Sequence, residues 1–174
     1  MTDRANFRNA PLTPAAPPRP TTSERGFSLI ELLIVVAIIG IIAAIAIPNL
    51  LASRRAANEA SAISAVRTLS SAQEAYRATV GGGAGFTDLD GLVARNMVDS
   101  ALGAATTPDK AKSGYVFSVV TSDSGRAFCA GAAPATVNTG GRNFSSDTPG
   151  LLYEHPLAVA APPTSTAGGT PLRQ

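Results

Sequence analysis

Residues 24–48 read ERGFSLIELLIVVAIIGIIAAIAIP and contain the longest apolar run in the chain. The 21 residues from 27 to 47 contain one charged side chain, Glu31. As an α-helix they would extend about 31 Å, which matches the hydrocarbon core of a bilayer. An acidic side chain at the centre of a bilayer costs roughly 2.5 to 3.5 kcal/mol on insertion, and less toward an end. Glu31 is therefore a candidate functional residue.

The position of the apolar run separates two kinds of targeting segment. An ordinary signal peptide or signal anchor has a basic start and an apolar core, and a cleaved one carries small residues after that core. Here Arg25 and Gly26 stand before the apolar run. A cut after Gly26 would leave the whole helix on the mature protein, with a free α-amine on Phe27, four residues before Glu31.

The residues RGFSLIELLIVVAIIG resemble the class III signal of type IV pilins and related pseudopilins. In that family a membrane prepilin peptidase removes the leader and methylates the new N-terminus. The resemblance implies that Gly26 is the last leader residue and that Phe27 becomes the N-methylated terminus. It implies that Glu31 neutralises the terminal amine of a neighbouring subunit during filament assembly. It also places Gly40 and Pro48 where many pilins carry residues that weaken or kink the helix.

Elementary electrostatics agrees with this role for Glu31. Opposite charges a few Å apart at low effective dielectric attract by several kcal/mol, so an amine docked beside the carboxylate relieves the cost of placing it in lipid. The same pairing would fix the axial register of neighbouring helices, because a displacement of one turn leaves both charges without a partner.

Charge alone does not orient the chain in a membrane. Arg19 and Arg25 before the apolar run are matched by Arg54 and Arg55 after it, so the count of flanking cations is equal. The resemblance implies a cytoplasmic N-terminus, a single-pass subunit of the inner membrane, and later a cell-surface filament. The partners it implies are other copies in a helical homopolymer, the prepilin peptidase, the inner-membrane pilus assembly machinery and, before assembly, the lipid bilayer.

The leader, residues 1–26, is rich in proline and is predicted to be disordered and then cleaved. It contains four arginines and two acidic residues, which equals the net charge of +2 of the whole chain. The mature chain is therefore neutral, and we predict no binding of nucleic acid.

The apolar pattern continues beyond the membrane-spanning stretch and predicts one long helix over residues 27–80. Its transmembrane segment covers residues 27–47, and its second half is amphipathic. Pro48 removes a backbone hydrogen bond and predicts a kink or local melting, with two separate helices as the alternative. A glycine-rich segment, residues 81–85, ends the helix.

The remainder predicts a globular head over residues 81–155. Residues 87–98 are spaced as a short helix, with Thr87 as the candidate N-cap. Alternating patterns bounded by turn residues predict antiparallel strands over residues 115–121, 126–133, 142–146 and 151–155. The predicted fold is α+β, a long N-terminal helix packed against a small antiparallel sheet of three or four strands, as in the pilin fold. Residues 156–174 lack hydrophobic periodicity and are predicted to be a disordered tail.

Few side chains in the head suit chemistry. His155, the single histidine, precedes a proline and is interpreted as a solvated strand end. Cys129 is the single cysteine, which excludes an intrachain disulfide. Asp147 alone is far from the six to eight oxygen ligands that calcium takes. We therefore expect no metal, no cofactor and no enzymatic activity.

The resemblance implies a structural subunit of a type IV pilus, a family with roles in cell adhesion and motility. A pseudopilin of a type II secretion system is the first alternative, and the missing calcium pattern favours the pilus over it. A membrane-anchored exported enzyme or binding protein is the second alternative.

Overall fold

The computed structural model describes residues 26–83, 85–148 and 150–172. The predicted leader up to residue 25 lies outside the described residues. The chain divides into two units, residues 1–40 and residues 41–174. Helix α1 (Leu29–Thr79) begins in the first unit and continues into the second as one element of 51 residues. The long helix predicted from the sequence is confirmed.

Helix α1 runs through both Gly40 and Pro48 without leaving the helical assignment. The alternative of two helices separated at Pro48 is therefore wrong. The kink stays a prediction. The buried residues of α1 all lie in its second half and recur at helical spacing, so a single face of this half is turned toward the core. They are Ala62, Ala65, Val66, Leu69, Ser70, Ala72 and Gln73.

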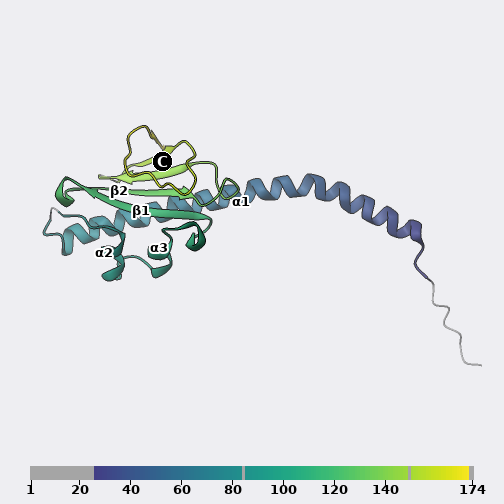
Figure 1. The fold of residues 1–174 in the computed structure, drawn as a ribbon, viewed down its shortest axis with the longest axis horizontal. Helices are drawn as coiled ribbons and strands as arrows, with labels where there is room; N and C mark the ends of the chain where they lie inside the picture. The colour runs from purple at the N-terminus through teal and green to yellow at the C-terminus, as the bar shows by residue number, and fades with distance from the viewer. Residues whose placement is uncertain (1–25, 84, 149, 173–174) are drawn as a thin grey trace, which may run out of the picture. The chain divides into compact units, whose positions relative to one another are not determined.

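The second unit contains one antiparallel sheet whose strands follow the order of the chain. The strands are β1 (Tyr115–Ser122), β2 (Ala127–Pro134), β3 (Asn143–Asp147), β4 (Leu152–His155) and β5 (Thr170–Pro171). Figure 1 shows β1 and β2 lying alongside the second half of α1. The α+β class is confirmed, with five strands rather than three or four because β5 adds to the edge at β4.

The core lies between α1, the sheet and two short helices. Its largest fully buried apolar side chains are Tyr115, Phe117, Phe144, Leu69, Leu92 and Leu102. Phe86 and Phe128 add a tilted aromatic pair with ring centroids 4.8 Å apart. The polar Gln73 is also buried, and its side-chain amide donates to the Thr87 carbonyl and accepts from the Thr87 N–H. That pairing satisfies an amide that would otherwise be costly to bury.

The short helix predicted over residues 87–98 is present but shorter, and a second short helix follows it. Helix α2 (Leu89–Ala94) is capped by Asp88, whose carboxylate accepts from the Gly91 N–H at 2.9 Å, so Thr87 is not the N-cap. Asn96, at φ 56°, breaks the helical path. Helix α3 (Ser100–Ala104), which the sequence did not predict, is capped by Asp99. Single 3-10 turns follow as η1 (Pro108–Lys110) and η2 (Asp123–Gly125).

An ionic cluster ties the β2–β3 loop to α1. Glu59 of α1 accepts from the Gly141 N–H at 2.8 Å and from the Arg142 guanidinium at 2.7 and 3.2 Å. Arg142 also pairs with Glu154 of β4 at 2.6 Å. The Glu59 hydrogen bonds raise the pKa of Arg142, as expected for a cation held between two carboxylates.

The described tail packs on the sheet, which differs from the disorder predicted for residues 156–174. The Asn143 side-chain amide donates to the carbonyls of Ala158 and Ala161 at 3.1 and 3.2 Å. Pro163 lies against Gly131, on the face of β2 opposite the core-facing alanines. Hydrogen bonds to a buried asparagine and close packing on a glycine hold this segment in place. Neither contact produces hydrophobic periodicity, so the sequence pattern did not predict an ordered tail.

Candidate assembly site

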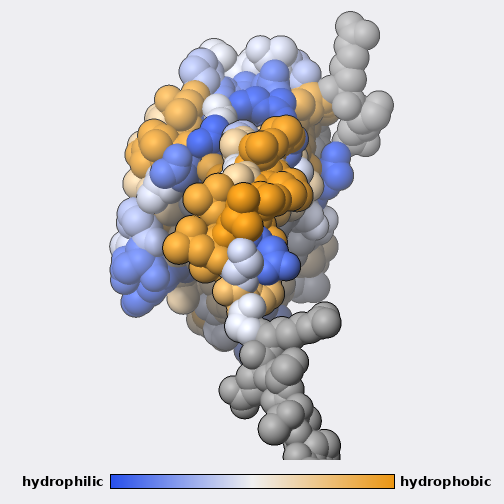
Figure 2. All heavy atoms as spheres, turned by 90° about the vertical axis from the view of Figure 1, so that its right-hand side faces the viewer, coloured by the Kyte–Doolittle hydropathy of each residue, from blue (hydrophilic) through white to orange (hydrophobic). Residues whose placement is uncertain are grey.

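The first half of α1 exposes its apolar side chains all round the helix. Figure 2, in which the right-hand side of Figure 1 faces the viewer, shows orange apolar side chains at the centre of the view. The exposed large apolar residues of α1 and of the segment just before it are Phe27, Leu29, Ile30, Leu32, Leu33, Ile34, Val35, Val36, Ile38, Ile39, Ile41, Ile42, Ile45, Ile47, Leu50 and Leu51. Among the described residues, α1 is the one helix long and apolar enough to cross a bilayer. A continuous apolar surface of this kind marks contact with a membrane or with another protein.

Glu31 lies in the first turn of α1 and caps that helix. The Ser28 N–H donates to Glu31 Oε2 at 2.9 Å, and Ser28 stands immediately before Leu29, the first helical residue. Serine followed three residues later by glutamate is the spacing of a capping box. Ser28 was not among the predicted site residues, although this spacing is visible in the chain. A carboxylate accepts about four hydrogen bonds, so Glu31 keeps acceptor capacity on Oε1.

Gly26 and Phe27 lie in an irregular, exposed segment ahead of the helix. A Cβ built on Gly26 meets no atom within 4 Å, and the Phe27 side chain is 76% exposed. The peptide bond between them is therefore accessible from solvent. The structure thus brings Gly26, Phe27 and Glu31 together at the start of one helix, whereas Gly40 and Pro48 lie further along it.

His155 and Cys129, the two head residues with the most reactive side chains, are both withdrawn from solvent in part or in full. His155 Nε2 lies 2.6 Å from Ser145 Oγ, and Ser145 is fully buried. His155 is half-buried, and desolvation lowers its pKa, so the interpretation as a solvated strand end was wrong. Burial raises the pKa of Cys129 to about 11 and keeps this group a thiol near neutral pH.

Asp147, the candidate cation ligand, serves instead to hold the tail. Its Oδ2 accepts from Thr166 Oγ1 at 3.1 Å. In the described ranges no group of three or more histidine, cysteine, aspartate or glutamate side chains is arranged to hold a metal ion.

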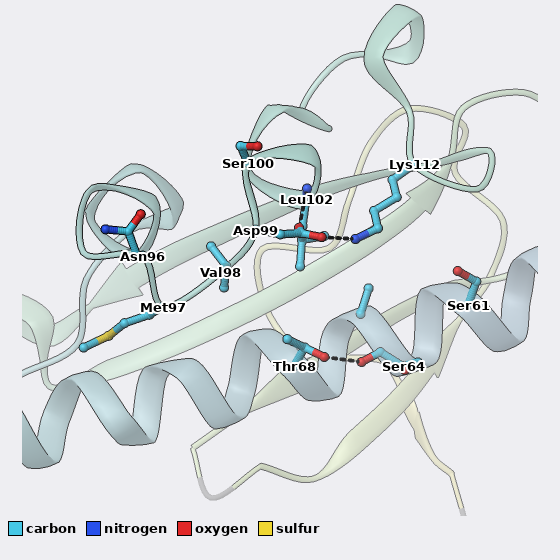
Figure 3. Close-up of a pocket in the computed structure, with 11 residues that line it drawn as sticks. Ser61, Ser64, Thr68, Asn96, Met97, Val98, Asp99, Ser100, Leu102 and Lys112 are labelled. Atoms are coloured by element: carbon cyan, nitrogen blue, oxygen red, sulfur yellow. Dashed lines mark hydrogen bonds and ion pairs between the residues drawn. The ribbon is translucent and has the colours of Figure 1, made fainter.

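A hollow of about 750 Å³ lies between α1 and the segment around α3. Figure 3 shows Ser61, Ser64 and Thr68 on the helix side, facing Asp99 and Lys112. Asp99 pairs with Lys112 at 2.8 Å, and that hydrogen bond, with the N–H that Asp99 caps, lowers the pKa of Asp99. Both charges are thus already used within the fold, and the hollow offers mainly hydroxyl groups.

Comparison with known proteins bears on the beginning of α1 and on the head. Residues 21–47 match the family described as the prokaryotic N-terminal methylation motif. The chain is 36% identical over 117 residues to the type IV wide pilus major component PilA4 of Thermus thermophilus, an alignment that covers 66% of this chain and 79% of that protein. No solved structure matches the chain.

Two further relatives match over shorter stretches. The chain is 50% identical over 53 residues to the type IV major pilin protein PilA of Myxococcus xanthus, covering 30% of this chain and 24% of that one. It is 36% identical over 59 residues to the type II secretion system core protein G of Escherichia coli, covering 34% of this chain and 41% of that one. These two alignments span less than half of the relatives concerned.

The alignment of 117 residues with PilA4 is longer than the segment that ends with α1 at Thr79, so it includes part of the head as well. Together with the methylation motif and the α+β architecture of a long helix on an antiparallel sheet, it assigns the family. The chain belongs to the type IV pilin family.

Proposed function

We propose that this protein is the structural subunit of a type IV pilus and enters the filament through α1. The observation that carries the proposal is an exposed apolar helix whose first turn holds one carboxylate, Glu31, four residues after Phe27. The similarity to the major component of a Thermus pilus, which extends into the head, supports the same function.

The proposed processing is cleavage between Gly26 and Phe27, followed by N-methylation of Phe27. The methylation motif over residues 21–47 supports this assignment. The open surroundings of Gly26 support it as well, because a prepilin peptidase must reach this bond without unfolding α1.

In the proposed filament, Glu31 of one subunit accepts the terminal amine of another. Glu31 lies four residues beyond Phe27, so a neighbour that places its amine beside this carboxylate is displaced by about 6 Å along the helix axis. The hydrogen bond from Ser28 occupies one carboxylate oxygen, and the amine of the neighbour takes the other.

Before assembly, the proposed subunit is held in the inner membrane by residues 27–47 with its N-terminus in the cytoplasm. Its partners at that stage are the bilayer, the prepilin peptidase and the inner-membrane assembly machinery. Gly40 and Pro48 are the positions at which we expect α1 to bend, since glycine and proline both weaken a helix interior.

A pseudopilus of a type II secretion system is the second candidate, because several relatives are named core protein G. Their alignments cover 54 to 59 residues, about half of the alignment with the Thermus pilin. A strain lacking this chain distinguishes the two candidates. Loss of sheared surface filaments supports the pilus, whereas loss of protein secretion with normal surface filaments supports the pseudopilus.

The direct test is to shear filaments from the source cells and to sequence their subunit by mass spectrometry. The expected N-terminal peptide begins with N-methylated Phe27 and continues Ser-Leu-Ile-Glu. Filaments that lack this protein, or a subunit that retains Gly26, would contradict the proposal.

A further inference from the structure

Two neighbouring loops at one end of the sheet carry exposed apolar side chains. Val137, in the loop after β2, is 58% exposed, and Leu157 and Val159, in the segment after β4, are 43% and 39% exposed. The Ala160 N–H donates to the Pro134 carbonyl at 2.9 Å and joins the two loops. Three exposed apolar side chains therefore lie at one end of the head, on two loops that a hydrogen bond connects.

The same end is tied to α1 just beyond its apolar run. The Arg55 guanidinium donates to the carbonyl and the side-chain oxygen of Asn138, both at 3.3 Å. The Asn58 amide donates to the Thr139 carbonyl at 3.0 Å. Leu51, the last exposed large apolar residue of the run, precedes Arg55 by four residues, which is about 6 Å along the helix.

This spacing sets how far beyond the apolar run of α1 the loops lie. If residues 27–47 fill a hydrocarbon core of about 30 Å, the headgroup layers extend the bilayer to about 40 to 45 Å in total. Leu51, about 6 Å beyond residue 47, then lies at the outer edge of a headgroup layer of about 5 to 7 Å, and the Arg55 backbone, about 12 Å beyond residue 47, lies outside that layer. Side chains of a helix tilt toward its N-terminus, so the Arg55 guanidinium is directed back toward the headgroups. The loop that this guanidinium holds, with Val137 on it, comes to the outer edge of the headgroup layer.

The chemistry at this level fits a phospholipid surface. Arg54 and Arg55 are both exposed and carry the cations that anionic headgroups attract. Apolar side chains beside cations are the combination with which peripheral segments enter the boundary between headgroups and acyl chains. A second copy of this neutral mature chain offers no comparable excess of negative charge.

We propose that Val137, Leu157, Val159, Arg54 and Arg55 form a membrane foot, with which the head of the unassembled subunit rests on phospholipid headgroups. The proposal rests on the proposed function, because it takes residues 27–47 to span the bilayer. The membrane foot holds the head at a fixed height before assembly and leaves the lipid surface when the subunit is extracted.

The chain contains no tryptophan, so a single introduced tryptophan reports its own surroundings. Full-length Val137→Trp and Leu157→Trp are placed in nanodiscs of phosphatidylcholine and phosphatidylglycerol, at one copy per disc. The matched control is Leu151→Trp, because Leu151 is 51% exposed and precedes β4, whereas Leu157 follows it. Circular dichroism verifies that each variant is folded.

Lipids that carry a nitroxide quencher on the headgroup are expected to quench Val137→Trp and Leu157→Trp and to shift their emission to the blue, with little effect on Leu151→Trp. The additional change Arg54→Ser, or discs without phosphatidylglycerol, should weaken this quenching. Equal quenching by aqueous iodide at all three positions, with no effect of the headgroup quencher, would overturn the proposal. Protection that arises only with several copies per disc would also overturn it, because the occupant would then be a second copy. Sequencing of sheared filaments tests the proposed function separately.

Discussion

Glu31 has two interactions to make, and two substitutions separate them. Within the subunit it accepts the Ser28 N–H at 2.9 Å, and in the proposed filament it accepts a charged amine. Glutamine also serves at the third position of a capping box, so Glu31→Gln keeps the cap and removes the charge. Glu31→Ala removes both.

The two contributions differ in size. Loss of an N-terminal cap costs about 0.5 to 2 kcal/mol. An incoming amine left buried without its carboxylate costs about 3 to 5 kcal/mol when the pair is fully desolvated. At 1.4 kcal/mol per factor of ten, that loss weakens subunit association by about two to four orders of magnitude. Glu31→Gln and Glu31→Ala should therefore impair assembly to a similar extent.

The assay combines electron microscopy of sheared material with an immunoblot of the membrane fraction. Both variants should be inserted and cleaved after Gly26, since neither step uses the charge pair, yet filaments should be absent or sparse. An ordinary membrane anchor predicts only improved insertion, because both changes remove a charge from lipid. Abundant normal filaments from the Glu31→Gln strain would refute the charge pairing and leave the cap as the role of Glu31.

Four further outcomes are expected. Gly26→Val should block cleavage by a co-expressed prepilin peptidase in a gel-shift assay, and because the chain itself leaves room for the side chain, normal cleavage would place the site elsewhere. Glu59→Ala should lower the stability of the head by about 1 to 3 kcal/mol, since it frees the half-exposed Arg142, and each kcal/mol lowers Tm by about 2 to 4 °C; an unchanged Tm would show that the ion pair contributes nothing. The pKa of Asp99 is lowered in the folded protein, so its carboxylate stabilises the fold at pH values above 3.8, its ordinary pKa, and this stability is lost as the pH falls through the folded pKa. Asp99→Asn should therefore make Tm fall less steeply with decreasing pH, and an equally steep fall in both proteins would contradict this. A truncated protein beginning at Ser53 should be soluble and melt cooperatively by circular dichroism, because the buried residues of α1 begin at residue 62; aggregation would argue against the packing.

The elements with strong periodicity were the ones that the sequence could predict. Helix α1 and strands β1 to β4 follow from hydrophobic spacing and from turn residues between strands. Short helices such as α3 are determined by one capping carboxylate rather than by periodicity, and five residues after Asp99 are too few to show a helical repeat. The capping box at Ser28 is likewise set by a single carboxylate, and its spacing from Glu31 stands out only when Glu31 is treated as a hydrogen-bond acceptor as well as a charge in lipid.

The order of the tail follows from a feature of β1 that the sequence displays. The centre of β1 is apolar on both faces, because Tyr115, Phe117 and Val119 alternate with Val116, Ser118 and Val120, and a sheet covered on one face does not require this pattern. Residues 156–172 supply cover for part of the second face of the sheet, where Pro163 meets Gly131 and accepts a weak hydrogen bond from the Cys129 thiol at 3.8 Å. A strand that is apolar on both faces therefore predicted a second covering segment, and the tail was the remaining stretch of chain able to provide it.

The capping interaction also lowers the cost of placing Glu31 in a membrane before assembly. Glu31 lies at the start of the apolar helix, where the cost of a carboxylate is lower than at the bilayer centre, and the Ser28 N–H offsets part of what remains. The dipole of α1 favours a negative charge at this end as well. These two effects lower the cost of the charge in the lipid-embedded monomer, and in the proposed filament the amine of the neighbouring subunit would supply the remaining charge partner. A carboxylate in the middle of the helix would have neither the Ser28 hydrogen bond nor the favourable end of the helix dipole. The first turn is therefore the position in α1 at which a carboxylate costs least in lipid.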